Sequence, residues 1–220
     1  LDNPPQPEDL ATIVFTSGTT GKSKGVMLSH KNITASAVAS AKVIQGTNAI
    51  GFLPMNHLFA WASALFLSNV FQAWGYICRS LKDIPGDMKK YSPQNMAGVP
   101  MLVETIYKTI WRTAEQKGSA DKLRKGLKIS NFLLKYGIDV RRKLFAQVLE
   151  GLGGRLKYFV VGGAALNPEV ANAFANFGIK VTQGYGITEC SPVVTVNRLD
   201  DFRFGSAGKV LDCNEIKIHE

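Results

Sequence analysis

The sequence predicts an α/β fold with a largely parallel sheet and helices on both of its faces. Short apolar runs alternate with longer segments of helical character along most of the chain, as in folds built from repeated strand and helix units. Three of the predicted strands lead into turns of small residues, the pattern expected where ligands bind at the carboxyl edge of an open α/β sheet. With 220 residues and 45% hydrophobic content, the chain can bury a substantial core.

The first half of the chain begins with an apolar run at 10–15, which we expect to form a buried strand. A loop rich in small residues follows it, and Ser29 then provides a suitable N-cap for a helix. The elements predicted after this cap are a helix at 30–44, a strand at 49–53, a helix at 58–74, a strand at 75–80, a turn around 83–86 and a strand at 95–99.

The second half is predicted to start with a helix at 101–115, because Pro100 suits a first helical turn, which does not use the missing N–H. Gly118, Gly137 and Gly151 mark breaks in the next section, which we expect to contain two helices. The remaining predicted elements are a strand at 156–161, a helix at 168–177, a strand at 179–182 and an edge strand at 215–220. Because nothing closes off this last strand, we expect the sequence to be part of a longer protein.

Positive charge is concentrated in residues 108–157, which we call the basic section. It holds 13 Lys and Arg against 4 Asp and Glu, whereas the rest of the chain is balanced, so it accounts for the formal net charge of +9. Such a section is compatible with an anionic membrane surface, an acidic partner or nucleic acid, but ordinary solvated helix faces explain it as simply. We favour solvated faces, keep the anionic membrane surface as the alternative, and expect no nucleic-acid partner.

The cysteines and the apolar stretches bear on the cellular compartment of the protein. Cys78, Cys190 and Cys213 are far apart and form no C-x-x-C motif, and the chain has only 3 His, so we expect neither a disulfide framework nor a zinc site. The longest apolar stretch, 58–74, is interrupted by polar residues and is better explained as a buried helix than as a membrane span. We therefore expect a cytoplasmic protein, with peripheral contact to the inner face of a membrane as the alternative.

The most informative stretch is 16–25, Thr-Ser-Gly-Thr-Thr-Gly-Lys-Ser-Lys-Gly. Its glycines allow successive backbone N–H groups to face one point and hold phosphate oxygens. The hydroxyls and the lysine that add donors and charge to this loop are Thr16, Ser17, Thr19, Thr20 and Lys22, with Gly18 and Gly21 between them. The P-loop spacing fails because Thr16 stands where the first glycine is required. The stretch predicts polyphosphate binding, and its alternative is an ordinary turn.

Two further turns follow predicted strands. In the run 158–166, Tyr-Phe-Val-Val-Gly-Gly-Ala-Ala-Leu, the small residues allow a flat ligand to approach the backbone closely, although tight packing explains them equally well. In the run 183–189, Gln-Gly-Tyr-Gly-Ile-Thr-Glu, glycines on both sides free the ring of Tyr185. Thr188 can donate to a phosphate, and Glu189 supplies the hard oxygen ligand that suits Mg²⁺. An isolated turn of this kind is usually structural.

Together, the loop at 16–25 and the run at 183–189 closely resemble the two signatures of the adenylate-forming superfamily, in the expected order. The resemblance extends from Asp9 to the Gly-Ser-Ala-Gly-Lys-Val run near the end, and it is strongest to the long-chain fatty acyl-CoA synthetases. It implies that the loop from Thr16 to Lys22 binds the β- and γ-phosphates of ATP. The adenine and AMP would be held by Gly163, Ala164, Ala165, Gln183, Gly184, Tyr185, Gly186 and Thr188. Thr16 and Glu189 would lie beside Mg²⁺, with Thr188 near the α-phosphate.

The acyl site implied by the resemblance lies in the segment 53–61. His57 would be close to the reacting carboxylate, with Leu58 beside it, and Trp61 stands where some fatty acyl members have an aromatic gate. Taken from the residues alone, a histidine after a strand is more often structural and a tryptophan more often core. The resemblance implies that Lys22, His57, Thr188 and Glu189 carry the catalysis.

The reaction implied is an acid–thiol ligation. A carboxylate, which for this branch is a long-chain fatty acid, attacks the α-phosphorus of ATP to give an acyl-adenylate and pyrophosphate. Coenzyme A, the co-substrate, then displaces AMP and forms the thioester. We expect residues 1–220 to be part of the large N-terminal adenylation domain and to be inactive alone, because the N-terminal portion and the C-terminal lid domain lie outside the sequence. The alternatives are adenylation of another carboxylate and a nucleotide-binding module without catalysis.

Overall fold

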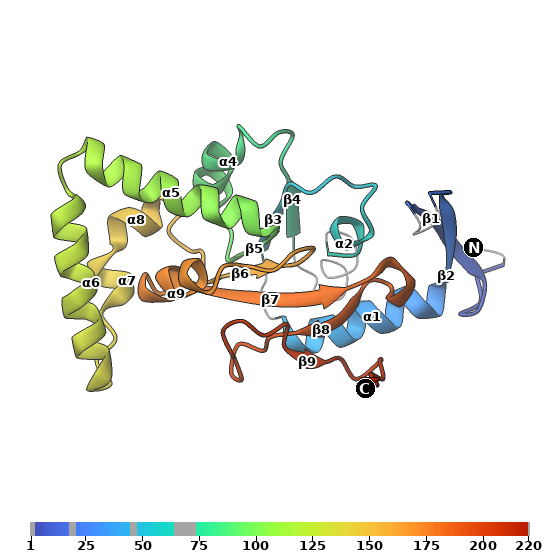
Figure 1. Cartoon of the computed structure of the whole chain (residues 1–220). Coiled ribbons are helices and arrows are strands. Elements are labelled where there is room, and N and C mark those ends of the chain that lie inside the picture. The colour runs from blue at the N-terminus through green and yellow to red at the C-terminus, as the bar shows by residue number, and fades with distance from the viewer. Residues whose placement is uncertain (1–2, 18–20, 45–47, 64–73, 220) are drawn as a thin grey trace.

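The computed structural model describes residues 3–17, 21–44, 48–63 and 74–219 (Figure 1). They form a mixed α/β arrangement, as predicted, with a seven-stranded sheet, its helices and a separate two-stranded hairpin. The strands are β1 (Leu10–Thr16), β2 (Lys24–Ser29), β3 (Asn48–Gly51), β4 (Trp74–Ile77), β5 (Asn95–Gly98), β6 (Tyr158–Val161), β7 (Lys180–Gly186), β8 (Val193–Val196) and β9 (Lys209–Val210). In the order β4-β3-β5-β6-β7-β8-β9, all pairs up to β7 are parallel, and β8 and β9 are antiparallel.

The helices cover both sides of this sheet. They are α1 (His30–Val43), α2 (Leu58–Trp61), α4 (Ile84–Tyr91), α5 (Pro100–Gln116), α6 (Ala120–Lys135), α7 (Arg141–Leu144), α8 (Ala146–Gly151) and α9 (Pro168–Asn176), followed by the 3₁₀ turn η2 (Thr188–Cys190). Helices α5 and α1 lie on opposite sides of β7 (Figure 1). Helix α9 packs on β7, and α5 and α6 pack on α9. None of the described helices is long and apolar enough to cross a membrane.

The core is centred on β6, whose four residues are all buried. Phe159 of this strand is fully buried and packs edge to face against Phe174 of α9, with ring centroids 5.3 Å apart. Phe177 and Phe145 extend the same aromatic cluster toward α7 and α8. Because parallel strands in the middle of a sheet are covered on both faces, their sequences are continuously apolar, as this one is.

Local signals in the sequence explain several boundaries. The hydroxyl of Ser29 accepts the N–H of Asn32, and the Asn32 side chain accepts the N–H of Ser29, which makes a capping box at the start of α1. Pro100 begins α5, as predicted. Asn167 caps α9, because its side chain accepts the N–H of Glu169 at 2.9 Å.

The structure corrects five predictions about the elements. The strand at 10–15 is not buried, because Phe15 is 72% exposed in a hairpin with one open face. Strand β2 was not predicted, since it is only six residues long and its last residue, Ser29, is also the N-cap of α1. The expected turn at 83–86 begins α4, where Pro85 occupies the first helical turn. Residues 118–152 form three helices instead of two, and residues 215–219 form no strand.

One other prediction extends beyond the described residues. Of the helix predicted at 58–74, only α2 and the residues up to 63 are described, and 64–73 lie outside the described residues. The three cysteines are free thiols, and burial raises the pKa of the Cys78 thiol to about 12.

Candidate functional site

The described residues of the stretch at 16–25 include the end of β1 and the start of β2. Thr16 pairs with Lys24 across the two strands, so the loop between them is closed by the last pair of the hairpin. Thr16 is half-buried, and Ser17, Gly21 and Lys22 are exposed. Gly21 has a φ of +78°, a conformation that favours glycine. Gly18, Thr19 and Thr20, three of the predicted phosphate-binding residues, lie outside the described residues.

The charge of this loop comes from two lysines. Lys22 and Lys24 are both exposed, and neither forms an ion pair within the described part of the chain. Cross-strand partners in an antiparallel pair place their side chains on the same face, so Lys24 lies on the face of Thr16. Of these two lysines, only Lys22 was predicted from the sequence to bind phosphate. The missed signal is the strand character of the run that begins at Lys24, which fixes this lysine opposite Thr16.

The second cluster is the turn after β6. The N–H of Gly162 donates to the carbonyl oxygen of Gly98 at 3.2 Å, which continues the sheet pairing one residue past the strand. Gly163 has a φ of +83°, and a Cβ atom there would have no heavy atom within 4 Å. Ala164 and Ala165 are exposed. The turn therefore leaves an open backbone at the carboxyl end of β6.

The third cluster begins at the neighbouring carboxyl end, because Val161 of β6 pairs with Gln183 of β7. The side-chain oxygen of Gln183 accepts the N–H of Leu166 at 3.4 Å, which ties the two turns together. A Cβ atom on Gly184 would come within 2.9 Å of the Thr195 oxygen, and one on Gly186 within 2.1 Å of the Pro192 oxygen. Both glycines are thus required for the close approach of β8, and Tyr185 between them is 54% exposed.

The turn η2 completes this third cluster and contacts strand β2 of the hairpin. Thr188 is half-buried in η2, and Glu189 is exposed. The carboxyl end of β7 points toward the hairpin and the N-terminal end of α1 (Figure 1). The turn that bears Glu189 therefore lies against the strand that leads out of the loop at 16–25. Segments more than 150 residues apart in the chain meet here.

The segment predicted to bind the acyl group, 53–61, contains α2, which lies between the hairpin and the seven-stranded sheet (Figure 1). His57 caps α2, with its Nδ1 accepting the N–H of Phe59 at 3.3 Å, and its ring is exposed. In the neutral ring this leaves the proton on Nε2. Leu58 is only 3% exposed and packs with Leu28 and Ile33, so its side chain belongs to the core under the hairpin.

Trp61 and Phe59 complete the position of α2. Trp61 is half-buried and packs against the same cluster as Leu58. The ring of Phe59 lies 4.0 Å from the position of a Cβ atom on Gly162, so α2 also reaches the turn after β6. Phe59 was not predicted, and nothing in the local sequence distinguishes it from a core aromatic residue. Helix α2 thus joins the hairpin to the rim formed by β6 and β7.

One cavity among the described residues lies elsewhere. It has a volume of about 510 Å³ and is lined by residues that include Lys42, Lys180, Arg198 and Asp212. Lys180 begins β7, whereas the three clusters follow the carboxyl ends of β6 and β7 and the hairpin loop. Lys42 is already paired with Asp212 at 2.5 Å. The cavity is therefore separate from the candidate site.

The model of a family described as AMP-binding enzyme matches residues 1–220. The chain is 31% identical over 231 residues to long-chain-fatty-acid–CoA ligase 5 of Mus musculus and 30% identical over 234 residues to long-chain-fatty-acid–CoA ligase 1 of Homo sapiens. These matches cover 99% and 98% of this chain but 34% and 33% of the relatives, so the chain spans about a third of their length.

Solved structures are similar over nearly the same extent. O-succinylbenzoate coenzyme A synthetase from Bacillus subtilis, in complex with ATP and a magnesium ion, has a TM-score of 0.70 at 22% identity, over 98% of this chain and 38% of that chain. Fatty acyl CoA synthetase from Mycobacterium tuberculosis has a TM-score of 0.67 at 19% identity, over 96% of this chain and 35% of that chain. At these identities the similarity shows a shared fold.

Proposed function

The chain belongs to the AMP-binding family of enzymes, and from this premise we propose that the full-length protein activates a long-chain fatty acid with ATP and transfers it to coenzyme A. The choice of acid is supported by the two long-chain-fatty-acid–CoA ligases at 30% and 31% identity. The observation that carries the proposal is the contact between η2 and β2, together with the Gln183–Leu166 hydrogen bond. These contacts support a single site that uses all three glycine-bearing clusters.

In this proposal the hairpin loop binds the triphosphate. Lys22 and Lys24 would offset the negative charge that builds up as pyrophosphate departs, because positive charge beside the phosphates stabilises the transition state. The exposed backbone at Gly163 and the ring of Tyr185 would hold the adenine. A carboxylate is already a nucleophile, so the protein needs alignment and charge neutralisation instead of a strong base.

The residues at the site fit a magnesium ion that arrives with the nucleotide. Among the described residues, no group of three or more His, Cys, Asp and Glu could hold a metal by itself. The donors present are the exposed carboxylate of Glu189 and the hydroxyl of Thr16. Mg²⁺ is commonly bound by one or two carboxylates plus substrate phosphates, which this donor set matches. When bound, the ion would neutralise phosphate charge.

His57 is proposed to position the fatty acid. Its Nδ1 is used by the N–H of Phe59, so the neutral ring can donate from Nε2 to an oxygen of the substrate carboxylate. Trp61, one turn further along α2, remains the candidate for the gate to the acyl chain. Leu58 would contribute indirectly, because its packing against Leu28 holds α2 on the hairpin.

The experiment is pyrophosphate release from ATP by the full-length protein, screened over long-chain fatty acids, aromatic acids and amino acids. We expect release with long-chain fatty acids, and acyl-coenzyme A as the product when coenzyme A is added. Release with a different class of acid would support the proposed adenylation reaction but contradict a long-chain fatty acid as the substrate. Nucleotide binding without release for any acid would instead identify a binding module.

The role of Lys24 can be tested with a matched control. Lys24→Ala should slow pyrophosphate release about tenfold, since a hydrogen bond to a charged group is worth roughly 1.5–3 kcal/mol. The control is Lys31→Ala, which removes an exposed lysine near the same hairpin whose ammonium group pairs with Glu8 at 2.8 Å. The control should retain its activity. If both substitutions changed the rate of pyrophosphate release equally, Lys24 would have no specific role in the site.

A further inference from the structure

The outward face of α6 and the residues just after it carry apolar side chains that nothing in the described structure covers. They are Ile129 and Phe132 in the helix, Tyr136 at its C-cap and Ile138 beyond it, which are 57%, 58%, 69% and 51% exposed, and we call them the α6 tip. Ile129, Phe132 and Tyr136 are spaced by three and four residues, so they lie on one side of the helix. The rings of Phe132 and Tyr136 are in contact, with centroids 5.1 Å apart. Single exposed apolar residues are ordinary, but a contiguous stripe marks an interaction surface.

The helix beneath the α6 tip is firmly held. Gly126 and Ser130 on its inner face are buried, and a Cβ atom on Gly126 would come within 3.3 Å of the Phe145 ring. Its end is fixed by Gly137, which has a φ of +77° and donates to the carbonyl of Leu134, while Ile138 donates to that of Leu133. This pair of bonds is a Schellman cap. The tip is therefore presented by a helix whose opposite side is anchored in the core.

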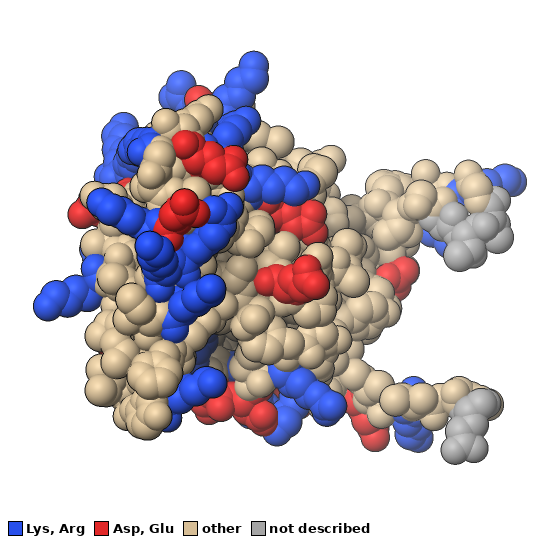
Figure 2. Space-filling view, turned by 60° about the vertical axis from the view of Figure 1, so that its left-hand side comes forward, with Lys and Arg blue, Asp and Glu red and all other residues tan. Residues whose placement is uncertain are grey.

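The unpaired charges that the described part of the chain places around the tip are positive. Lys125, Lys128 and Lys135 of the same helix are exposed, and they form no ion pair within the residues that the structure describes. The nearby acids are already neutralised, since Arg124 lies 2.8 Å from Asp121 and Arg141 lies 2.6 Å from Asp139. Figure 2 brings this end of the molecule forward and shows Lys and Arg outnumbering Asp and Glu on it.

We propose that the α6 tip docks the full-length protein on a membrane surface that contains anionic lipids. The aromatic and aliphatic side chains would enter the interfacial layer, and the three lysines would reach the headgroups while their methylene stems lie along the apolar surface. Anionic lipid is the occupant because the excess of positive charge complements it. A wholly polar polyanion would use the lysines but leave the four apolar side chains in water.

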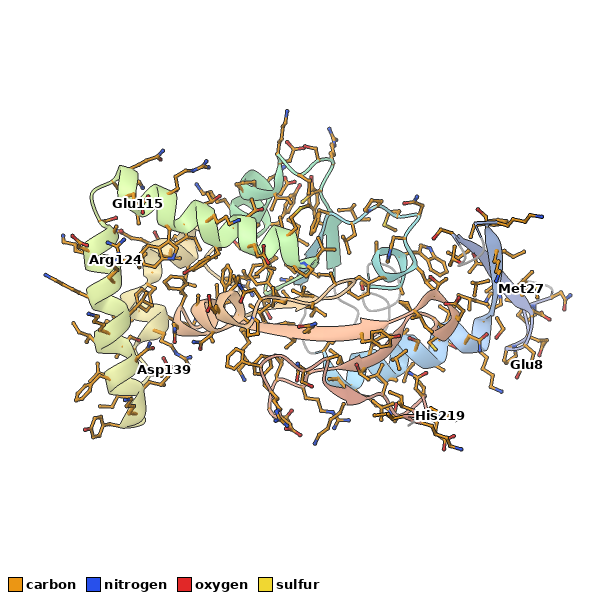
Figure 3. The ribbon with its side chains drawn as sticks, viewed as in Figure 1. Glu8, Met27, Glu115, Arg124, Asp139 and His219 are labelled. Atoms are coloured by element: carbon orange, nitrogen blue, oxygen red, sulfur yellow. The ribbon has the colours of Figure 1, made fainter. Side chains whose placement is uncertain are left out.

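This inference deepens the proposed function and rests on it for its purpose, because a long-chain fatty acid partitions into membranes. The tip and the candidate site lie at opposite ends of the molecule. In Figure 3, Arg124 and Asp139 mark α6 and the residues just after it, and Met27 marks the hairpin at the far end. Docking through the tip therefore leaves the hairpin and the carboxyl ends of β6 and β7 accessible.

The experiment is sedimentation of the full-length protein with phosphatidylcholine vesicles that contain or lack phosphatidylglycerol. We expect binding to the anionic vesicles that weakens with added salt. The triple variant Lys125→Gln, Lys128→Gln, Lys135→Gln should lower the partition coefficient roughly a hundredfold, at about fivefold for each lysine. The double variant Phe132→Ser, Tyr136→Ser should lower it about tenfold by removing the inserted area.

The matched control is the triple variant Lys82→Gln, Lys89→Gln, Lys90→Gln, which removes the same charge from exposed positions on and before α4. It should bind almost as well as the unchanged protein. The proposal is overturned if the unchanged protein shows no preference for anionic vesicles, or if the α4 variant loses as much binding as the α6 variant. It is also overturned if the tip mediates a dimer in the absence of lipid that Phe132→Ser dissociates.

Pyrophosphate release from ATP, with a short, water-soluble fatty acid as the substrate and without vesicles, separates this test from that of the proposed function. The α6 variants should retain it, since they lie far from the hairpin. Vesicle binding without any acid activation would support the docking surface and contradict the proposed function. Acid activation without vesicle binding would support the proposed function and contradict the docking surface.

Discussion

Strands β6 and β1 are both rich in apolar residues but have opposite surroundings. Tyr-Phe-Val-Val in β6 is fully buried between parallel neighbours, whereas Leu-Ala-Thr-Ile-Val-Phe-Thr in β1 belongs to a hairpin that exposes alternate residues. The core around β6 is built from aromatic contacts with α9. The hairpin has fewer such contacts, and its loop presents glycine and lysine to solvent. The difference indicates that stability is concentrated around β6 and chemistry around the hairpin.

The largest expected effect is the loss of packing at β6. Phe159→Ala should lower the free energy of unfolding by about 3–5 kcal/mol, because the fully buried ring leaves a cavity beside Phe174. Chemical denaturation of the full-length protein measures this change. A loss below about 1 kcal/mol would show that β6 is not the centre of the core.

The second effect is a loss of activity that leaves the stability of the fold nearly unchanged. Lys22→Ala should slow pyrophosphate release about 10- to 100-fold, because one charge-assisted contact to the phosphates is lost. The midpoint of denaturation should stay nearly unchanged, since the side chain is exposed. A substitution that unfolds the protein as strongly as it slows the reaction would contradict the division between the two regions.

A smaller effect concerns pH and the junction of α7 with α9. The guanidinium of Arg141 donates to Asp139 and to the carbonyl of Ala175, and its hydrogen bond lowers the pKa of the Asp139 carboxyl to about 2. A carboxyl with a lowered pKa stabilises the folded state above its ordinary pKa, and this stabilisation is lost as pH falls from about 4 to about 2. The pair is half-exposed, so we expect less than about 1 kcal/mol. Unfolding of Asp139→Asn should show less dependence on pH in this window.

The smallest effect is expected on the open face of the hairpin. Phe15→Ser should change the free energy of unfolding by less than about 0.5 kcal/mol, because the ring is 72% exposed. The same denaturation assay applies, with Phe159→Ala as its reference. A loss similar to that of Phe159→Ala would show that another part of the full-length protein covers this face.

The sequence predicted the elements where one local signal dominates. Ser29 caps α1 and Pro100 starts α5, because capping and proline geometry act within one turn. It failed where local signals compete with tertiary contacts. Pro85 and Gly86 indicated a turn but lie inside α4, and alternation at 215–220 indicated a strand that residues 215–219 do not form. Apolar content alone could not distinguish the buried β6 from the exposed face of β1.

For the candidate site, the sequence provided the residues but not their arrangement. Glycine and hydroxyl patterns identified the three clusters, since each reflects a local backbone requirement. The contact between η2 and β2, the position of Lys24 opposite Thr16 and the burial of Leu58 depend on segments distant in the chain. Such contacts leave no periodic signal, and only the fold brings them together.

The most direct test is a double-mutant cycle on pyrophosphate release by the full-length protein, using Lys22→Ala, Glu189→Gln and both together. If the two side chains act on one magnesium nucleotide, the double variant should lose clearly less than the sum of the single losses, with a coupling of about 1 kcal/mol or more. Losses that add within about 0.5 kcal/mol would mean that the hairpin loop and the turn at Glu189 serve separate sites, which would contradict the account.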